Sequence, residues 1–300
     1  MPRAELEGLL QLMRTAPQPE SIAEMRATME ATAGFLNSNL PELKHYEAKV
    51  PIGDGVTADV LVPAGETPLP VFVHLHGGGW SIGSAATHAK IARELAVGSG
   101  ALTVNVEYRL APENPFPRPL DDCVTAVRWV REHGRRYGGD PSRLAIGGDS
   151  AGGNLSAAVI NDLAGEIDFR AALLLYGAYD LEACWRDYDR WAPEEDPVLQ
   201  KRPMKMMLDA YISGGARLDD ERVSPLRADL RHFPPALLLC GTWDPIYGDS
   251  IAFCDKLRAA GRDATLLSYE AMPHAFMQLP CTEGTQAVAA ACSFLRRQLA

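Results

Sequence analysis

Short apolar runs recur along the chain and alternate with longer segments in which apolar residues return every three or four positions. Short runs rich in Val, Leu, Ile and Ala are typical of buried strands, whereas the longer periodic segments are typical of helices that pack on one face. The pattern predicts strands at residues 46–51, 58–62, 71–75, 102–107, 144–147, 172–176, 236–240 and 264–269. It predicts helices at residues 88–98, 120–137, 155–163, 250–260 and 285–299.

The order of these elements indicates the fold class. Strand, helix and strand in repetition are typical of an α/β protein with a mostly parallel sheet that is covered by helices on both faces. The first two strands differ, because only a short Gly-Asp-Gly turn at residues 53–55 separates them. Such a turn predicts an antiparallel hairpin, so the eight-stranded sheet is expected to be mixed.

Two segments fall outside this alternation. Residues 1–40 form amphipathic helical stretches that are broken at the Pro-Gln-Pro of residues 17–19, and residues 180–223 are rich in Trp, Met and Tyr. Ligands bind at the carboxyl edge of parallel sheets, so we interpret both segments as a lid over that edge. A dimer contact or plain packing is the alternative interpretation. The expected organisation is N-terminal cap helices at 1–45, a core at 46–180, a cap insertion at 181–223 and the rest of the core at 224–300.

Composition and charge exclude several classes of function. With 47% hydrophobic and 23% charged residues the chain has an ordinary globular composition, and its net charge of −10 argues against nucleic-acid or anionic membrane surfaces as partners. No apolar stretch is long enough to span a bilayer and the first residues do not resemble a secretory signal, so we expect a cytoplasmic protein. The six cysteines lack zinc-like or C-x-x-C spacing, which favours buried free thiols and no metal site.

The most informative motif is Gly-Asp-Ser-Ala-Gly at residues 148–152, which follows an apolar run and precedes a small-residue helix. A Gly-x-Ser-x-Gly turn between strand and helix is the nucleophile elbow, in which the serine hydroxyl is exposed on a tight turn. We therefore predict that Ser150 is a catalytic nucleophile.

A serine hydroxyl needs a base within hydrogen-bond reach, and the base needs an acid that orients it. Among seven histidines, His274 is preferred as the base because it follows the last predicted strand, at the same sheet edge as Ser150. Asp244 is preferred as the acid because it directly follows another strand and gives the chain order Ser, Asp, His. Asp180 is the rival at the same edge, while Asp249 is placed to cap a helix.

The His-Gly-Gly-Gly-Trp run at residues 76–80 follows the third strand and predicts an oxyanion hole. Successive glycines let backbone N–H groups approach a substrate, so Gly77, Gly78 and Ala151 are expected to donate hydrogen bonds to the oxyanion. A phosphate cradle is disfavoured, because no Lys-Ser/Thr pair follows the glycines. Trp80 is expected to form a wall of the acyl pocket, with pure packing as the alternative.

Three motifs in this order resemble those of the bacterial hormone-sensitive-lipase-like esterases. They are the run at 76–80, the Glu-Tyr-Arg-Leu-Ala-Pro-Glu segment at 107–113, and the Gly-Asp-Ser-Ala-Gly-Gly-Asn segment at 148–154. In that family the acid loop usually reads Asp-Pro-Leu-x-Asp-Glu, whereas here residues 244–249 read Asp-Pro-Ile-Tyr-Gly-Asp. The catalytic aspartate is kept, so the departure affects local capping and polarity only. Glu107 and Arg109 are interpreted as a structural ion pair or loop anchor.

The resemblance implies an α/β-hydrolase with a helical cap that hydrolyses carboxylic esters of short to medium acyl chains, without metal or organic cofactor. It also makes a homodimer paired through the last strand an option, with the oligomeric state left open. We expect Trp80, Met207, Tyr211 and Phe276 to contact the small-molecule ester. The same triad could instead hydrolyse a lactone, an amide or a carbamate, and a non-catalytic ligand receptor on this scaffold is the more distant alternative.

Overall fold

The computed structural model describes residues 4–192 and 196–300, and its centre is a single sheet. In spatial order the strands run β1-β2-β4-β3-β5-β6-β7-β8. Their bounds are β1 His45–Gly53, β2 Val56–Val62, β3 Leu69–Leu75, β4 Leu102–Glu107, β5 Gly139–Asp149, β6 Ala171–Leu175, β7 Ala236–Gly241 and β8 Ala264–Tyr269. Every strand that the apolar runs predicted is present, with ends that differ by a few residues.

The sheet is mixed, as the hairpin signal predicted. Strand β2 is antiparallel to both β1 and β4, and the other neighbouring pairs are parallel. The turn between β1 and β2 uses Gly53, Asp54 and Gly55, all with positive φ (123°, 51° and 79°). Glycine and aspartate tolerate this backbone region, which explains why the chain reverses here.

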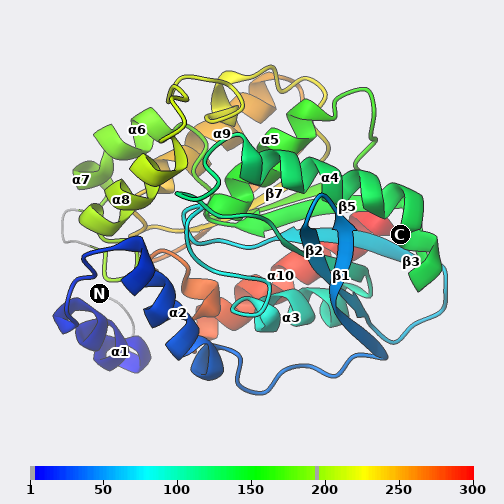
Figure 1. The fold of residues 1–300 in the computed structure, drawn as a ribbon, viewed down its shortest axis with the longest axis horizontal. Coiled ribbons are helices and arrows are strands. Elements are labelled where there is room, and N and C mark those ends of the chain that lie inside the picture. Colours follow the sequence, from blue (N-terminus) through cyan, green and yellow to red (C-terminus); the bar gives the residue numbers. More distant parts are fainter. Residues whose placement is uncertain (1–3, 193–195) are drawn as a thin grey trace.

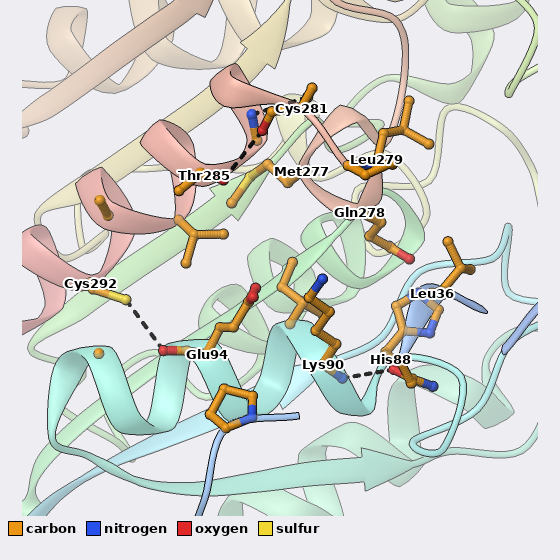
Figure 2. A pocket seen from close by; sticks show the side chains of 18 of the residues that line it. Leu36, His88, Lys90, Glu94, Met277, Gln278, Leu279, Cys281, Thr285 and Cys292 are labelled. Atoms are coloured by element: carbon orange, nitrogen blue, oxygen red, sulfur yellow. Dashed lines mark hydrogen bonds between the residues drawn. The ribbon is translucent and has the colours of Figure 1, made fainter. Parts of the chain in front are cut away.

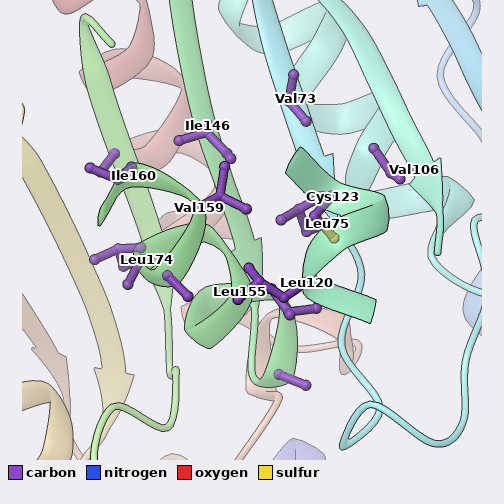
Figure 3. Close-up of a cluster of buried hydrophobic side chains, with 14 of the residues drawn as sticks. Val73, Leu75, Val106, Leu120, Cys123, Ile146, Leu155, Val159, Ile160 and Leu174 are labelled. Atoms are coloured by element: carbon purple, nitrogen blue, oxygen red, sulfur yellow. The ribbon is translucent and has the colours of Figure 1, made fainter. Parts of the chain in front are cut away.

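Helices cover both faces of the sheet (Figure 1). Helices α4 (Arg118–His133), α5 (Ala151–Asp162) and α9 (Tyr247–Ala259) pack on one face, and α3 (Ala89–Ser99) and α10 (Thr282–Leu299) pack on the other. Alternate residues of a strand enter the two cores: Leu174 faces α5, while Leu173 lies in the second cluster. Figure 3 shows the first core, where side chains of α4 and α5 interdigitate with those of the central strands. This arrangement confirms the predicted α/β-hydrolase class.

The remaining helices gather at one end of the molecule (Figure 1). They are α1 (Ala4–Thr15) and α2 (Ile22–Leu36) from the N-terminal segment, with α6 (Leu181–Arg186), α7 (Tyr188–Trp191) and α8 (Lys201–Tyr211) from the insertion. Three short 3₁₀ turns complete the described elements: η1 Gly134–Tyr137, η2 Pro225–Arg227 and η3 Phe276–Gln278. Among the described helices, none has the length and apolar character needed to cross a bilayer.

Candidate active site

Ser150 lies at the turn between β5 and α5 with φ 53° and ψ −117°, a backbone conformation that residues other than glycine rarely adopt. The flanking glycines make the turn possible. A Cβ at either Gly148 or Gly152 would collide with the backbone carbonyl of Leu75 on the neighbouring strand. The Ser150 N–H donates to the Leu175 carbonyl at 2.8 Å, which ties the turn to β6. The elbow is thus held between two strands and presents the serine hydroxyl outward.

Three side chains from separate loops form a hydrogen-bonded row. Ser150 Oγ lies 2.9 Å from Nε2 of His274, and Nδ1 of His274 lies 2.7 Å from Oδ2 of Asp244. The other carboxylate oxygen, Oδ1, accepts the N–H of Ile246 at 2.9 Å. Asp244 is fully buried and His274 is 4% exposed. The three residues chosen from sequence therefore lie together at the carboxyl edge of the sheet.

Opposing effects act on the pKa of His274. Burial lowers the pKa of the imidazole because it disfavours the charged form, but the charge and hydrogen bond of Asp244, together with the charges of Asp196 and Asp149, raise it by more. The net result is a pKa raised above the ordinary histidine value. An imidazole in this state is well suited to receive a proton from Ser150.

The two rival aspartates have structural tasks. Asp180 caps α6 by accepting the N–H of Ala183 at 3.1 Å. Asp249 is buried and its Oδ2 accepts the N–H groups of Tyr179 (2.5 Å) and Asp180 (2.6 Å), so it anchors the loop after β6. Burial raises the pKa of Asp249 to about 6. Neither carboxylate contacts His274 through a hydrogen bond in the part of the chain that the structure describes.

Asp149, next to the nucleophile, is the centre of a second buried group. Its Oδ2 lies 3.3 Å from Nε2 of His88 and accepts a hydrogen bond from Nε2 of Gln278 at 3.0 Å, while His74 approaches Oδ1 at 3.7 Å. Burial alone would raise the pKa of Asp149, but the charge and hydrogen bond of His88 outweigh it and hold this pKa at about 2. Asp149 is therefore an anion fixed between the elbow, helix α3 and the His274 loop.

Asp149 also determines which glycine N–H groups are available to bind an oxyanion. The N–H of Gly77 donates to Asp149 Oδ1 at 3.1 Å, so the prediction that Gly77 is an oxyanion donor is wrong. Gly78 and Gly79 line the pocket beside Ala151, with φ of 110° and 54° for the two glycines. The N–H groups of Gly78, Gly79 and Ala151 form no hydrogen bond with another described residue. The geometry thus moves the candidate donors one position along the chain, to Gly78 and Gly79.

The motif at residues 107–113 anchors loops, although its charged residues do not pair with each other. Glu107 accepts the N–H of Ala85 at 2.6 Å, which fixes the loop after the glycine run. Arg109 instead pairs with Asp122 of α4, where Nε lies 2.8 Å from Oδ2. Tyr108, between them, donates from its hydroxyl to the His76 carbonyl at 2.7 Å. The segment therefore holds the oxyanion loop in place from outside the pocket.

A cavity of about 550 Å³ opens above Ser150. Its wall includes apolar residues of α1, α2 and the insertion, among them Leu9, Met25, Met29, Val198, Leu199 and Met204. Trp80 and Met207 line it, as expected. Tyr211 and Phe276 do not, and both predictions are wrong for the same reason: these rings are completely buried behind the wall. Tyr211 stacks on Trp80 at 4.3 Å, and Phe276 packs against Tyr269 at 5.0 Å in the second core.

A second cavity of about 680 Å³ lies between α3 and α10 and is more polar (Figure 2). It shares Leu36, His88, Gln278 and Leu279 with the cavity above Ser150, but it does not include Ser150 or His274. Lys90 and Glu94 from α3 face it, opposite residues of η3 and α10 (Figure 2). Because the nucleophile lines only the smaller cavity, that cavity is the candidate substrate site.

The described residues contain no group of three or more His, Cys, Asp or Glu side chains placed to hold a metal ion. All six cysteines are buried, and none of them forms a disulfide with another described residue. Three contributors at the site were missed from sequence: Gly79, Asp149 and Asp196, whose carboxylate accepts the backbone N–H of His274 at 3.0 Å. The glycine run and the elbow motif contain the first two, so a signal existed for them. No sequence pattern marks Asp196, because its partner lies 78 positions away.

Comparison with known proteins shows the same family throughout. Residues 72–278 match the family model described as alpha/beta hydrolase fold. The carboxylesterase NlhH of Mycobacterium tuberculosis is 37% identical over 248 residues, which are 79% of this chain and 77% of that protein. The esterase LipI of the same organism is 33% identical over 253 residues, covering 79% and 76%. The hyperthermophilic esterase from the archaeon Pyrobaculum calidifontis superposes with a TM-score of 0.91 at 30% identity, covering 99% of both chains.

The chain therefore belongs to the α/β-hydrolase family, which confirms the resemblance to hormone-sensitive-lipase-like esterases. Within that family it is similar to a bacterial carboxylesterase and an archaeal esterase over most of its length.

Proposed function

We propose that the protein is a serine carboxylesterase that hydrolyses short- to medium-chain acyl esters through an acyl-enzyme intermediate. The row from Ser150 Oγ through His274 to Asp244, with separations of 2.9 and 2.7 Å, is the observation that supports this most directly. Its named relatives support the class of reaction, since they are esterases and carboxylesterases. The protein is an enzyme of the carboxylic ester hydrolase class; the residues and the substrate range are what we propose.

The chemistry follows from the placement of each group. His274 Nε2 takes the Ser150 proton as the hydroxyl oxygen attacks the ester carbonyl carbon. The carbonyl oxygen becomes an oxyanion and receives hydrogen bonds from the N–H groups of Gly78, Gly79 and Ala151. The imidazolium, stabilised by Asp244, then protonates the departing alcohol. Water, deprotonated by the same histidine, attacks the acyl-enzyme and releases the carboxylic acid.

The cavity supports a small apolar substrate. At about 550 Å³, with a largely apolar wall in which Leu and Met are the most frequent side chains, it has the size and apolar character of a small-molecule site. Methionine side chains adapt to different shapes, which fits a range of acyl chains. Helices α1 and α2 and the insertion form the wall above the nucleophile, so they act as the cap of the site.

A chain-length series of p-nitrophenyl esters tests the proposal, run with wild-type protein and with Ser150→Ala. We expect the highest kcat/KM at short or medium chains and turnover near background in the variant, with unchanged circular dichroism. A serine-directed phosphonate is expected to label the wild-type protein at Ser150. Full esterase activity in Ser150→Ala would eliminate this nucleophile, and faster turnover of lactone, amide or carbamate substrates would redirect the proposal to those compounds.

Two further expectations come from the family resemblance. Strand β8 ends the sheet and no described strand pairs with its outer edge, so this edge could pair with a second copy of the chain. We propose that such pairing gives a homodimer, which size-exclusion chromatography with light scattering measures directly. A cytoplasmic location is also proposed, and fractionation of cells that express the protein tests it.

A further inference from the structure

Asp196 is a buried carboxylate of the insertion, situated between α7 and α8 and only 3% exposed. Its oxygens accept three backbone hydrogen bonds. Oδ1 takes the N–H groups of Val198 at 2.8 Å and Leu199 at 2.7 Å, and Oδ2 takes the N–H of His274 at 3.0 Å. Among the described residues no lysine or arginine forms an ion pair with it. Burial and the charge of Asp244 raise the pKa of this carboxyl above its ordinary value, and the hydrogen bonds from the backbone N–H groups of Leu199 and His274 act in the opposite direction.

The bond to His274 connects two parts of the chain that have separate tasks. His274 belongs to the loop after β8, whereas Asp196 belongs to the insertion that covers the substrate cavity. His274 is therefore held by two carboxylates from different elements: Asp244 binds its ring at Nδ1, and Asp196 binds its backbone N–H. Charge-assisted hydrogen bonds of this kind are stronger than those between neutral groups, so both orient the residue firmly.

The same carboxylate also shapes the substrate wall. Residues 197–200 follow Asp196 directly and all line the cavity above Ser150. Two of the amides that Asp196 binds belong to this stretch, and the hydroxyl of Tyr188 donates to the Leu199 carbonyl at 2.6 Å from the other side. A shift of this wall would therefore displace the acceptor of the His274 amide.

We propose that Asp196 is a positioning residue for the catalytic base, which couples the seating of wall residues 197–200 to the placement of His274 and adds negative charge beside it. The inference rests on the proposed role of His274 as the general base. It assigns to the cap a part in the chemistry beyond shaping the cavity. A substrate that displaces residues 197–200 would therefore also move His274 out of its reactive position.

The charge of Asp196 has a measurable consequence, because few groups act on His274. Asp244 faces it from the loop after β7, Asp149 from the end of β5 and Asp196 from the insertion, and each of these carboxylates raises the pKa of the imidazole. The ring of Tyr176, from the end of β6, packs on it edge-on at 5.2 Å, and Ser150 occupies Nε2. Removing the charge of Asp196 while Asp244 and Asp149 stay in place therefore lowers the pKa of His274, and a variant that keeps this charge separates the electrostatic effect from a loss of placement.

The test uses Asp196→Asn in the full-length protein, which keeps the size of the side chain and removes its charge. We expect kcat to fall about tenfold or more, because the base is less well placed. We also expect the acidic limb of the kcat/KM pH profile to move down by about half to one pH unit. Asp196→Glu keeps the charge but displaces it, so it should lower kcat without the downward shift.

Asp209→Asn is the matched control, since Asp209 is an exposed carboxylate on α8 of the same cap, paired with Lys205 at 2.6 Å. The Asp209→Asn variant should change neither kcat nor the acidic limb of the kcat/KM pH profile. An Asp196→Asn pH profile whose acidic limb does not move from that of the wild type overturns the inference, whether or not kcat changes. If the Asn variant fails to fold, Asp196→Ser takes the same test. Loss of fold in all three Asp196 variants by circular dichroism would assign a folding role only and would also overturn it.

The proposed function is tested separately in the same experiment. A wild-type protein without esterase turnover or phosphonate labelling at Ser150 refutes the esterase proposal itself. Normal wild-type turnover and labelling, together with an unshifted Asp196→Asn profile, refute the role of Asp196 alone.

Discussion

Replacing Gly79 by alanine tests whether the oxyanion donors are Gly78 and Gly79. Gly79 has φ 54°, in the left-handed region where an L side chain is strained by about 1–2 kcal/mol. A Cβ at this position would also collide with the Met207 sulfur and come within 2.8 Å of the Met207 Cβ. The Cβ of Met207 is fixed to the backbone and cannot move away as the flexible end of the side chain can. The glycine loop therefore has to shift, and the backbone N–H of residue 79 then no longer points towards the oxyanion.

The expected loss follows from the number of donors affected. One misdirected oxyanion donor costs on the order of 3 kcal/mol of transition-state stabilisation, or about a hundredfold in kcat. KM should change little, because the neutral ester carbonyl needs these donors far less than the oxyanion does. The midpoint of thermal unfolding should fall by only a few degrees, in line with a strain of about 1–2 kcal/mol in a protein of this size.

The assay is steady-state hydrolysis of p-nitrophenyl butyrate with parallel thermal melts. Gly34→Ala is the control, because a Cβ at Gly34 in α2 has no atom within 4 Å. Adding Met207→Ala to Gly79→Ala should restore part of kcat, since it removes the colliding side chain and leaves only the backbone strain. A folded Gly79→Ala protein with kcat within about twofold of wild type would refute the assignment of Gly79 as a donor.

Three further predictions concern the charged groups and the core. The kcat/KM of the wild-type protein should rise with pH through a midpoint above 6.5, because Asp244 raises the pKa of His274 and only the neutral imidazole accepts the serine proton; a flat profile from pH 5 to 9 would contradict this. Asp149→Asn should lose about 2 kcal/mol of unfolding free energy at neutral pH. Since the pKa of Asp149 in the folded protein lies at about 2, below the ordinary value of an aspartate, this loss should shrink as the pH falls from about 4 towards 2; a loss that stays constant over this range in denaturant melts would contradict the electrostatic cause. Leu174→Ala removes a fully buried side chain and should cost about 2–5 kcal/mol in urea unfolding with kcat little changed; a loss below about 1 kcal/mol would show that this core collapses around the gap.

The positions of the strands along the chain could be predicted from sequence because central strands such as β6 and β7 are apolar and buried on both faces. Leu173 and Leu174 enter opposite cores, so β6 reads as one continuous apolar run with turn residues on either side. Strand β5 was predicted too short for a physical reason. Gly139 and Asp140 pair with the start of β3 ahead of a register irregularity, and their polar or missing side chains give no strand signal.

The site was predictable where the chemistry needs a local motif, as at Ser150, and where a residue directly follows a strand at the carboxyl edge, as Asp244 and His274 do. The backbone conformation of Ser150 requires small neighbours, so the elbow is visible in five consecutive residues. The choice between Gly77 and Gly79 depends on Asp149, which captures the Gly77 N–H from 72 positions away. Aromatic character alone also misplaced Tyr211 and Phe276, because a ring that packs behind a wall and a ring that forms one have the same composition. Contacts between residues that are far apart in the sequence produce no periodic pattern of residue types, so they could not be predicted from it.

The seating of helix α1 links the cavity to a distant part of the chain. Leu6 and Leu10 are buried in the same cluster as Phe276 and Met277, which directly follow the loop of His274. Leu9 and Met13 of the same helix line the cavity above Ser150. Undocking of α1 would therefore open this cavity to solvent while leaving the strands of the sheet paired.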